Sequence, residues 1–177
     1  MIVGFESRTP RNLVCPRGTT VNAIANKQCQ VKFYELLGMQ VIKKLSFPDS
    51  KFDLYFLGYD HPKSLSHGNS TFDREGLIEL THNYGTESNA DYKINNGNVE
   101  PHRGFGHTCI SVDNIQAACK RIEDAGYKFQ KKLSDGKMRH IAFALDPDGY
   151  WVEIISQKPI EETEHVTETD VGTYHMV

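Results

Sequence analysis

The chain has 177 residues, a net charge of −3, 38% hydrophobic and 10% aromatic residues, which fits one compact domain or two small packed modules rather than a disordered chain. The slightly negative charge and the lack of Lys/Arg blocks argue against a nucleic-acid partner, and no apolar run approaches the roughly 20 residues that span a bilayer. The N-terminal residues lack the apolar core of a secretory signal, and the four cysteines show no CxxC pair, so we expect a cytoplasmic protein with reduced thiols and no membrane contact.

The first half of the chain predicts a helix followed by three strands. QCQVKFYELL (28–37) places Cys29, Phe33 and Leu37 on one helical face, with Asn26 as a possible N-cap. Strands are then expected in the stretch that runs into KKL (43–45), in the alternating segment 52–57, and in EGLIELTH (75–82). A polar loop at 60–75 is inserted between the last two strands, and loops of this length are often lids or binding segments.

The second half predicts the same elements after an opening strand. GFGHTCISV (104–112) is read as a strand and NIQAACKRIEDA as a helix, with Asp113 or Asn114 as its N-cap and Gly126 at its left-handed end. HIAFALD and YWVEIIS are predicted to form a hairpin around the DPDG turn at 146–149.

An internal repeat relates the two halves. GMQVIKKL begins at Gly38 and GYKFQKKL at Gly126, so the two copies lie 88 residues apart. Each copy reads strand, helix, strand, strand, strand, which predicts an α+β fold of paired βαβββ modules whose sheets leave a cleft between them. The expected divisions are a divergent N-terminal segment (1–18), a first module (19–83), a connecting loop (84–103), a second module (104–156) and an acidic tail or linker (157–177).

Three polar side chains fall inside otherwise apolar strands: Glu79 in LIELT, His107 in GFGHTCI and Glu153 in WVEII. Burying a carboxylate is costly unless it is paired or binds a metal, and two Glu with one His suit a divalent ion. Each residue alone could equally be an edge-strand residue that faces solvent.

Several longer stretches resemble one known family. KFDLYFLGY, LIELTHNYGTE, GNVEPHRGFGHTCISV, DGKM and DPDGYWVEII, in this order between about Phe33 and Ile155, are similar to glyoxalase I of the longer eukaryotic and fungal kind. The resemblance implies the fold of the vicinal oxygen chelate superfamily. It also implies a role in methylglyoxal detoxification as a lactoylglutathione lyase, which converts the methylglyoxal–glutathione hemithioacetal to S-lactoylglutathione by metal-assisted proton transfer through an enediolate. The implied metal is Zn²⁺, and no residue excludes Ni²⁺.

The resemblance also implies roles for individual residues. Glu79, His107 and Glu153 match metal ligands, and Glu153 matches the catalytic base. The residues that match contacts to the glutathione-bearing substrate are Asn83, Arg103, His107, Lys131, Lys137 and Met138, and those that match an apolar pocket are Phe47, Leu54, Phe56, Ile141 and Phe143. For Lys131 a solvated surface charge is the alternative, because Lys43 occupies the equivalent place in the other copy.

The family's fourth metal ligand lies on the first strand, and that position here holds Thr19. Counting back from FYE gives Thr19, and so does the repeat, because residue 19 lies 88 positions before His107. A neutral hydroxyl is a poor ligand beside imidazole and carboxylate, so we expect weakened metal affinity. Calorimetric titration with Zn²⁺ that gives one tight site per chain would argue against this expectation, and Thr19→His should strengthen binding.

The family builds each site across two subunits or two halves of one chain, so the resemblance implies a homodimer or pairing with a second glyoxalase half. The tail from 157 resembles the linker of tandem fungal enzymes, which favours one half of a tandem enzyme; a disordered acidic end is the alternative. The second functional hypothesis is a catalytically impaired or inactive fragment that only binds glutathione conjugates or a partner half. A superfamily dioxygenase is disfavoured, because it typically uses two His and one carboxylate around iron.

Overall fold

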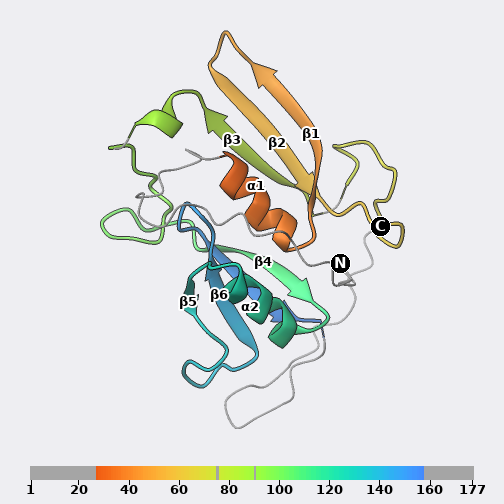
Figure 1. Cartoon of the computed structure of the whole chain (residues 1–177), viewed down its shortest axis with the longest axis vertical. Helices are drawn as coiled ribbons and strands as arrows, with labels where there is room; N and C mark the ends of the chain where they lie inside the picture. The colour runs from red at the N-terminus through yellow and green to blue at the C-terminus, as the bar shows by residue number, and fades with distance from the viewer. Residues whose placement is uncertain (1–26, 75, 90, 158–177) are drawn as a thin grey trace, which may run out of the picture.

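The computed structural model describes residues 27–74, 76–89 and 91–157. Two sheets occupy opposite halves of the molecule in Figure 1, and each has its own helix. The predicted N-terminal segment, the Asn26 cap and Thr19 lie outside the described residues, as does the tail from 158 onward.

The first half contains α1 (Lys27–Leu36), β1 (Gln40–Phe47), β2 (Phe52–Gly58) and β3 (Ile78–Asn83), followed by a short 3₁₀ helix (Thr86–Ser88). The three strands form an antiparallel sheet in the order β1-β2-β3. The second half contains β4 (His107–Val112), α2 (Ile115–Asp124), β5 (Phe129–Lys131), β6 (Ile141–Leu145) and β7 (Trp151–Ser156). Its sheet has the order β4-β7-β6-β5, with β4 parallel to β7. The α+β prediction is therefore confirmed.

The internal repeat is visible in the helices, which end 88 residues apart, at Leu36 and Asp124. Each helix is followed by a glycine with positive φ, 90° at Gly38 and 84° at Gly126, a conformation that is costly for other residues. Asn114 caps α2, because its side chain accepts a hydrogen bond from the Ala117 amide at 3.0 Å. The opening strand of the second module is β4, and the opening strand predicted for the first module, near Thr19, lies outside the described residues.

One hydrophobic core serves both modules. It contains the buried faces of α1 and α2 together with helix-facing residues of both sheets; its fully buried members include Phe33, Leu57, Ile122, Val152 and Ile154. The inner positions of β6 and β7 are also small or branched apolar residues, which lets the helix approach the sheet closely. The faces of the two sheets that lie away from the helices therefore point outward from this core.

The cysteines differ in part from the prediction of reduced thiols. Cys109 and Cys119 are free, whereas Cys29 is disulfide-bonded. Cys29 occupies the predicted buried face of α1, and a helical apolar pattern reads the same for a thiol and for a disulfide sulfur. Among the described residues, no helix has the length and apolar character needed to cross a membrane.

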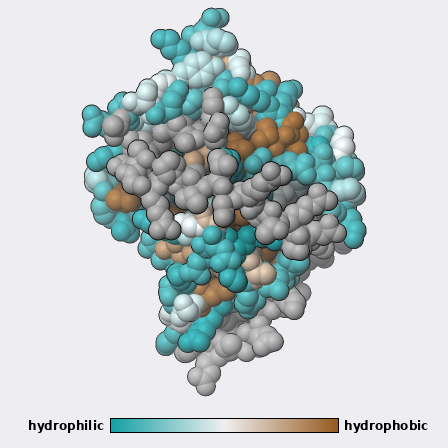
Figure 2. Space-filling view, in the orientation of Figure 1, coloured by the Kyte–Doolittle hydropathy of each residue, from teal (hydrophilic) through white to brown (hydrophobic). Residues whose placement is uncertain are grey.

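Large apolar side chains remain exposed at scattered positions. Figure 2 shows small hydrophobic patches within a mostly hydrophilic face of the molecule. Leu65 is 89% exposed, Phe72 is 70% exposed and Phe47 is 40% exposed. Phe72 nevertheless reaches back to the first sheet, where its ring packs edge-on against Phe56 with centroids 5.3 Å apart. The loop inserted between β2 and β3 therefore covers part of the outer face of that sheet.

Asp53 is a buried carboxylate on β2, 3% exposed. The Tyr84 hydroxyl donates to it at 2.7 Å and the Lys44 ammonium lies 2.9 Å away. Burial by itself raises the pKa of Asp53, but the hydrogen bonds from Tyr84, Lys44 and Ser46 outweigh burial and hold this pKa well below its usual range.

This lowered pKa predicts a loss of stability in acid. A depressed carboxyl pKa contributes stability above the unfolded value near pH 4, and the contribution is lost as the pH falls from there toward the folded value. Asp53→Asn should lower the melting temperature at neutral pH and flatten its dependence on pH below about 4, as measured by circular dichroism. Asp124→Asn, which removes an exposed pair with Lys120, is the control. Identical acid slopes for wild type and Asp53→Asn would contradict the assignment.

Candidate active site

Glu79 and Glu153 occupy equivalent positions on the outer faces of the two sheets. In the strand register Glu79 lies opposite Phe56, and Glu153 lies opposite Phe143 on one side and Cys109 on the other. Paired residues in adjacent strands project from the same face of a sheet. The predictions that Glu79, His107 and Glu153 lie in strands are confirmed.

His107 and Glu153 are in contact. His107 begins β4, and its Nε2 lies 3.2 Å from Oε2 of Glu153 on the neighbouring β7. The side chain of His107 is 40% exposed and that of Glu153 is 16% exposed, so both remain reachable from solvent. The ring of Phe143 packs edge-on against His107 at 5.1 Å between centroids. An imidazole and a carboxylate thus lie in contact on a solvent-accessible surface, beside the aromatic ring of Phe143.

Cys109 is a member of this cluster that the sequence interpretation did not single out. Its thiol is hydrogen-bonded to Glu153; burial, followed by that bond and the charge of Glu153, raises the pKa of the thiol to about 11. The thiol is therefore protonated at neutral pH. Strand alternation could have indicated this residue, because the side chains of residues 107 and 109 lie on the same face of β4.

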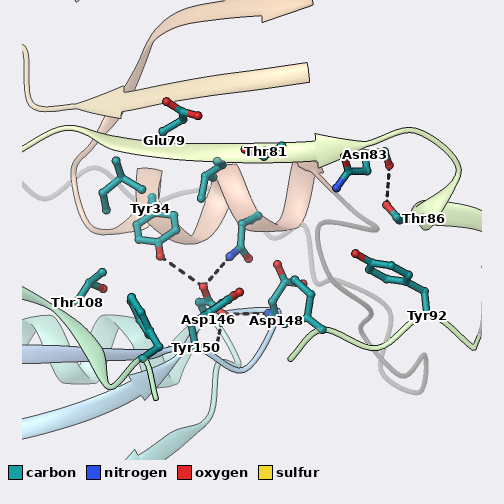
Figure 3. A pocket seen from close by; sticks show the side chains of 15 residues that line it. Tyr34, Glu79, Thr81, Asn83, Thr86, Tyr92, Thr108, Asp146, Asp148 and Tyr150 are labelled. Atoms are coloured by element: carbon teal, nitrogen blue, oxygen red, sulfur yellow. Dashed lines mark hydrogen bonds between the residues drawn. The ribbon is translucent and has the colours of Figure 1, made fainter. Parts of the chain in front are cut away.

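Glu79 does not join His107 and Glu153 within one chain. Among residues 27–74, 76–89 and 91–157, no three acidic, histidine or cysteine side chains are grouped so that they could hold a metal ion. Figure 3 shows Glu79 on the side of β3 that faces away from Asp146 and the second module. This differs from the expected cleft between the two sheets of one chain. The reason is the shared core, which turns the helix-covered faces inward and the faces with the candidate ligands outward.

The predicted apolar residues divide between these two outer faces. Phe47, Leu54 and Phe56 accompany Glu79 on the first sheet, while Ile141 and Phe143 accompany Glu153 on the second. Phe47 stacks on Phe52 with centroids 4.7 Å apart. Each face therefore presents one glutamate beside aromatic and aliphatic side chains.

The predicted substrate contacts lie in exposed segments. Arg103 pairs with Glu100 at 2.7 Å, and both side chains are 70% exposed. Asn83 ends β3 and is exposed, as are Lys137 and Met138 in the segment between β5 and β6. Lys131 differs, because its ammonium donates to three main-chain carbonyl oxygens.

A cavity of about 370 Å³ lies where the two modules meet (Figure 3). At its floor the carboxylate of Asp146 accepts hydrogen bonds from the Gln30 side chain at 2.6 Å and from the amides of Asp148 and Tyr150 at 3.0 and 2.9 Å. Burial, with the nearby charge of Asp148, raises the pKa of Asp146 to about 7. The β6–β7 turn thereby binds α1 of the other module, a link that the turn motif alone did not reveal.

The donor set fits half of a site for a divalent cation. One imidazole nitrogen and one carboxylate oxygen, 3.2 Å apart and solvent-accessible, suit Zn²⁺ or Ni²⁺. Structural and catalytic zinc sites have three or four protein ligands. The third predicted metal ligand, Glu79, lies on the outer face of the first sheet.

Comparison with known proteins identifies the family. Residues 28–154 match the Glyoxalase/Bleomycin resistance protein/Dioxygenase superfamily. The lactoylglutathione lyase of Schizosaccharomyces pombe is 54% identical over 128 residues, which cover 72% of this chain and 42% of that protein. Glyoxalase I of Saccharomyces cerevisiae is 53% identical over 71% of this chain and 40% of its own. The chain therefore spans about two fifths of the length of these fungal relatives.

A bacterial relative and two solved structures extend the similarity. The lactoylglutathione lyase of Pseudomonas putida is 42% identical over 80% of this chain and 84% of its own. Glyoxalase I of Leishmania major, described as trypanothione-dependent, superposes with a TM-score of 0.56 at 28% identity, covering 75% of this chain and 80% of that one. Maize glyoxalase I gives a TM-score of 0.55 at 31% identity, covering 74% and 41%. The chain belongs to the glyoxalase I family of this superfamily.

Proposed function

We propose that the chain is a lactoylglutathione lyase that isomerises the hemithioacetal of methylglyoxal and glutathione to S-lactoylglutathione. The observation that carries the proposal is the contact between His107 and Glu153 at 3.2 Å on an accessible face, in a chain 42% identical to a bacterial lactoylglutathione lyase across most of both sequences. Zinc is the proposed metal, with nickel as the alternative. Placement in the cytoplasm stays a prediction from the sequence.

Glu153 is the proposed base. Its carboxylate takes the proton from the carbon that carries sulfur and returns it to the adjacent carbonyl carbon, while the hydroxyl proton moves to the neighbouring oxygen. A divalent cation held by His107, Glu153 and Glu79 would polarise the two vicinal oxygens of the substrate and stabilise the negative charge that develops there. Phe143 beside His107 excludes water from one side of the reacting carbon.

The proposed site is completed by a second module from another chain, in a homodimer or from a second glyoxalase half. Glu79 on one outer face and His107 with Glu153 on the other become neighbours only when two such faces meet. Phe47 and Phe72, 40% and 70% exposed on the first face, support this pairing, because large apolar side chains at a surface often mark contact sites. Arg103, Lys137, Met138 and Asn83 are the proposed contacts to glutathione, whose carboxylates need cations and amide donors.

The proposal is tested by mixing the protein with preformed hemithioacetal and Zn²⁺ or Ni²⁺ and following absorbance at 240 nm. Growth that depends on protein and metal is the expected result. No turnover with either metal would overturn the proposal and support the alternative of a fragment that only binds glutathione conjugates or a partner half. Binding of S-hexylglutathione, measured by calorimetry, then decides whether such a fragment keeps the substrate site.

A further inference from the structure

Lys131 ends β5 and stands at the base of the segment that connects β5 to β6. We define this segment, residues 132–140, as the β5–β6 loop. The ammonium of Lys131 donates to the carbonyl oxygens of Lys132 at 3.1 Å, Met138 at 2.6 Å and Ile141 at 3.0 Å. Lys132 is the first residue of the loop, Met138 lies near its other end, and Ile141 is the first residue of β6. The ammonium of Lys131 therefore connects the two ends of the loop.

These contacts use the full donor capacity of the side chain. A lysine ammonium has three N–H donors and no acceptor, and each donor here has a carbonyl partner. Hydrogen bonds from a charged donor are stronger than neutral ones. In this arrangement Lys131 has no N–H left for a carboxylate of the substrate, which separates it from Lys137, whose side chain is exposed.

The start of the loop is anchored separately, because Lys132 pairs with Glu123 on α2 and Leu133 packs against the core; the rest of the loop has few other restraints. The Asp135 carboxylate accepts from the Lys132 amide at 2.8 Å, and the Arg139 amide donates to the Lys137 carbonyl at 3.0 Å. Both bonds are local, and neither ties the loop to β6. The loop side chains from 134 to 139 are exposed, so apolar packing contributes little to their position. The cation of Lys131 is therefore, among the described contacts, the one that ties the far part of the loop, at Met138, to the sheet.

We propose that Lys131 is a positioning residue that orders the β5–β6 loop and so presents Lys137 and Met138 to the substrate. The ordering of the loop stands on the three hydrogen bonds, whereas the benefit to substrate rests on the proposed function. Lys131 thus acts on glutathione through the loop, without a contact of its own.

Hydrogen exchange measured by mass spectrometry on the ligand-free protein tests the structural part. Lys131→Met should speed exchange of the amides in the β5–β6 loop by on the order of tenfold, because charged hydrogen bonds that close the loop are lost. Lys120→Met is the matched control: its ammonium pairs with Asp124 within α2, outside the loop, and loop exchange should stay at the wild-type rate. Wild-type exchange in Lys131→Met would overturn the proposal, whatever the activity of the protein.

Calorimetric binding of S-hexylglutathione tests the part that concerns substrate, with Lys131→Arg as a second variant. Arg keeps the charge and suits a carboxylate, but its planar fork does not match three converging carbonyls. If Lys131 positions the loop, amide exchange in the loop should rise and the affinity for S-hexylglutathione should fall, each by about tenfold, in both variants. Weaker affinity with unchanged exchange, or full affinity in Lys131→Arg with a fast-exchanging loop, would show direct contact and overturn it. If the wild type does not bind, the proposed function fails, and the exchange result still decides the role of Lys131.

Discussion

Glu153→Gln should lower kcat by a hundredfold or more, within the range of about 10² to 10⁴ that general acid–base catalysis contributes. Glutamine keeps the size of the side chain and one oxygen near His107, but it cannot accept and return a proton. The rate is measured at 240 nm with saturating hemithioacetal and excess Zn²⁺. Metal content of the purified variant, measured in parallel, separates loss of the base from loss of a ligand.

Glu123→Gln is the matched control for this substitution. Glu123 lies on α2, is exposed and pairs with Lys132, so its replacement should leave kcat within about twofold, as is usual for surface changes. A Glu153→Gln enzyme that retains metal and more than half of the wild-type rate would show that another group moves the proton.

Phe33→Ala should destabilise the fold by about 3–5 kcal/mol, the usual cost of truncating a buried phenylalanine. Phe33 on α1 is fully buried, and its ring meets Tyr34 and Tyr127 edge-on at 5.2 and 4.9 Å. Tyr127 follows α2, so the truncation opens a cavity at the junction of the two modules. Urea unfolding followed by far-UV circular dichroism measures the change.

Leu65→Ala is the control for the core substitution, since Leu65 is 89% exposed and should cost less than about 0.5 kcal/mol. A loss below about 1 kcal/mol for Phe33→Ala would indicate that the site repacks without a cavity, and that the two modules do not depend on this contact.

Periodicity and the repeat predicted much of the fold. The helix predicted over 28–37 is observed at Lys27–Leu36, and the DPDG turn joins β6 to β7 as expected. The hairpin predicted around this turn is observed as the antiparallel pair of β6 and β7, in which Glu153 lies opposite Phe143. These features follow from contacts that are local in the sequence or set by strand period.

What the sequence could not predict depends on contacts between distant segments. Alternation defines two faces for each sheet but does not say which face of one sheet turns toward the other. The separation of Glu79 from His107 was therefore expected only from the resemblance, which implies a site built across two subunits or two halves. The three carbonyl contacts of Lys131 depend on the path of the loop that follows it. The hydrogen bond between Gln30 and Asp146 joins residues 116 positions apart, and the sequence around each residue does not indicate its partner.

If Glu79 of one chain and His107 with Glu153 of another form a single site, two variants that are inactive alone should restore activity together. Two inactive variants, Glu79→Gln and Glu153→Gln, carry different affinity tags, are co-expressed, and are purified through both tags in turn. A mixed dimer then holds one site with both glutamates intact and one site with neither, so its activity should return to about half of the wild-type value per dimer. Mixed dimers as inactive as either parent would place both glutamates in the same site of one chain and contradict the account.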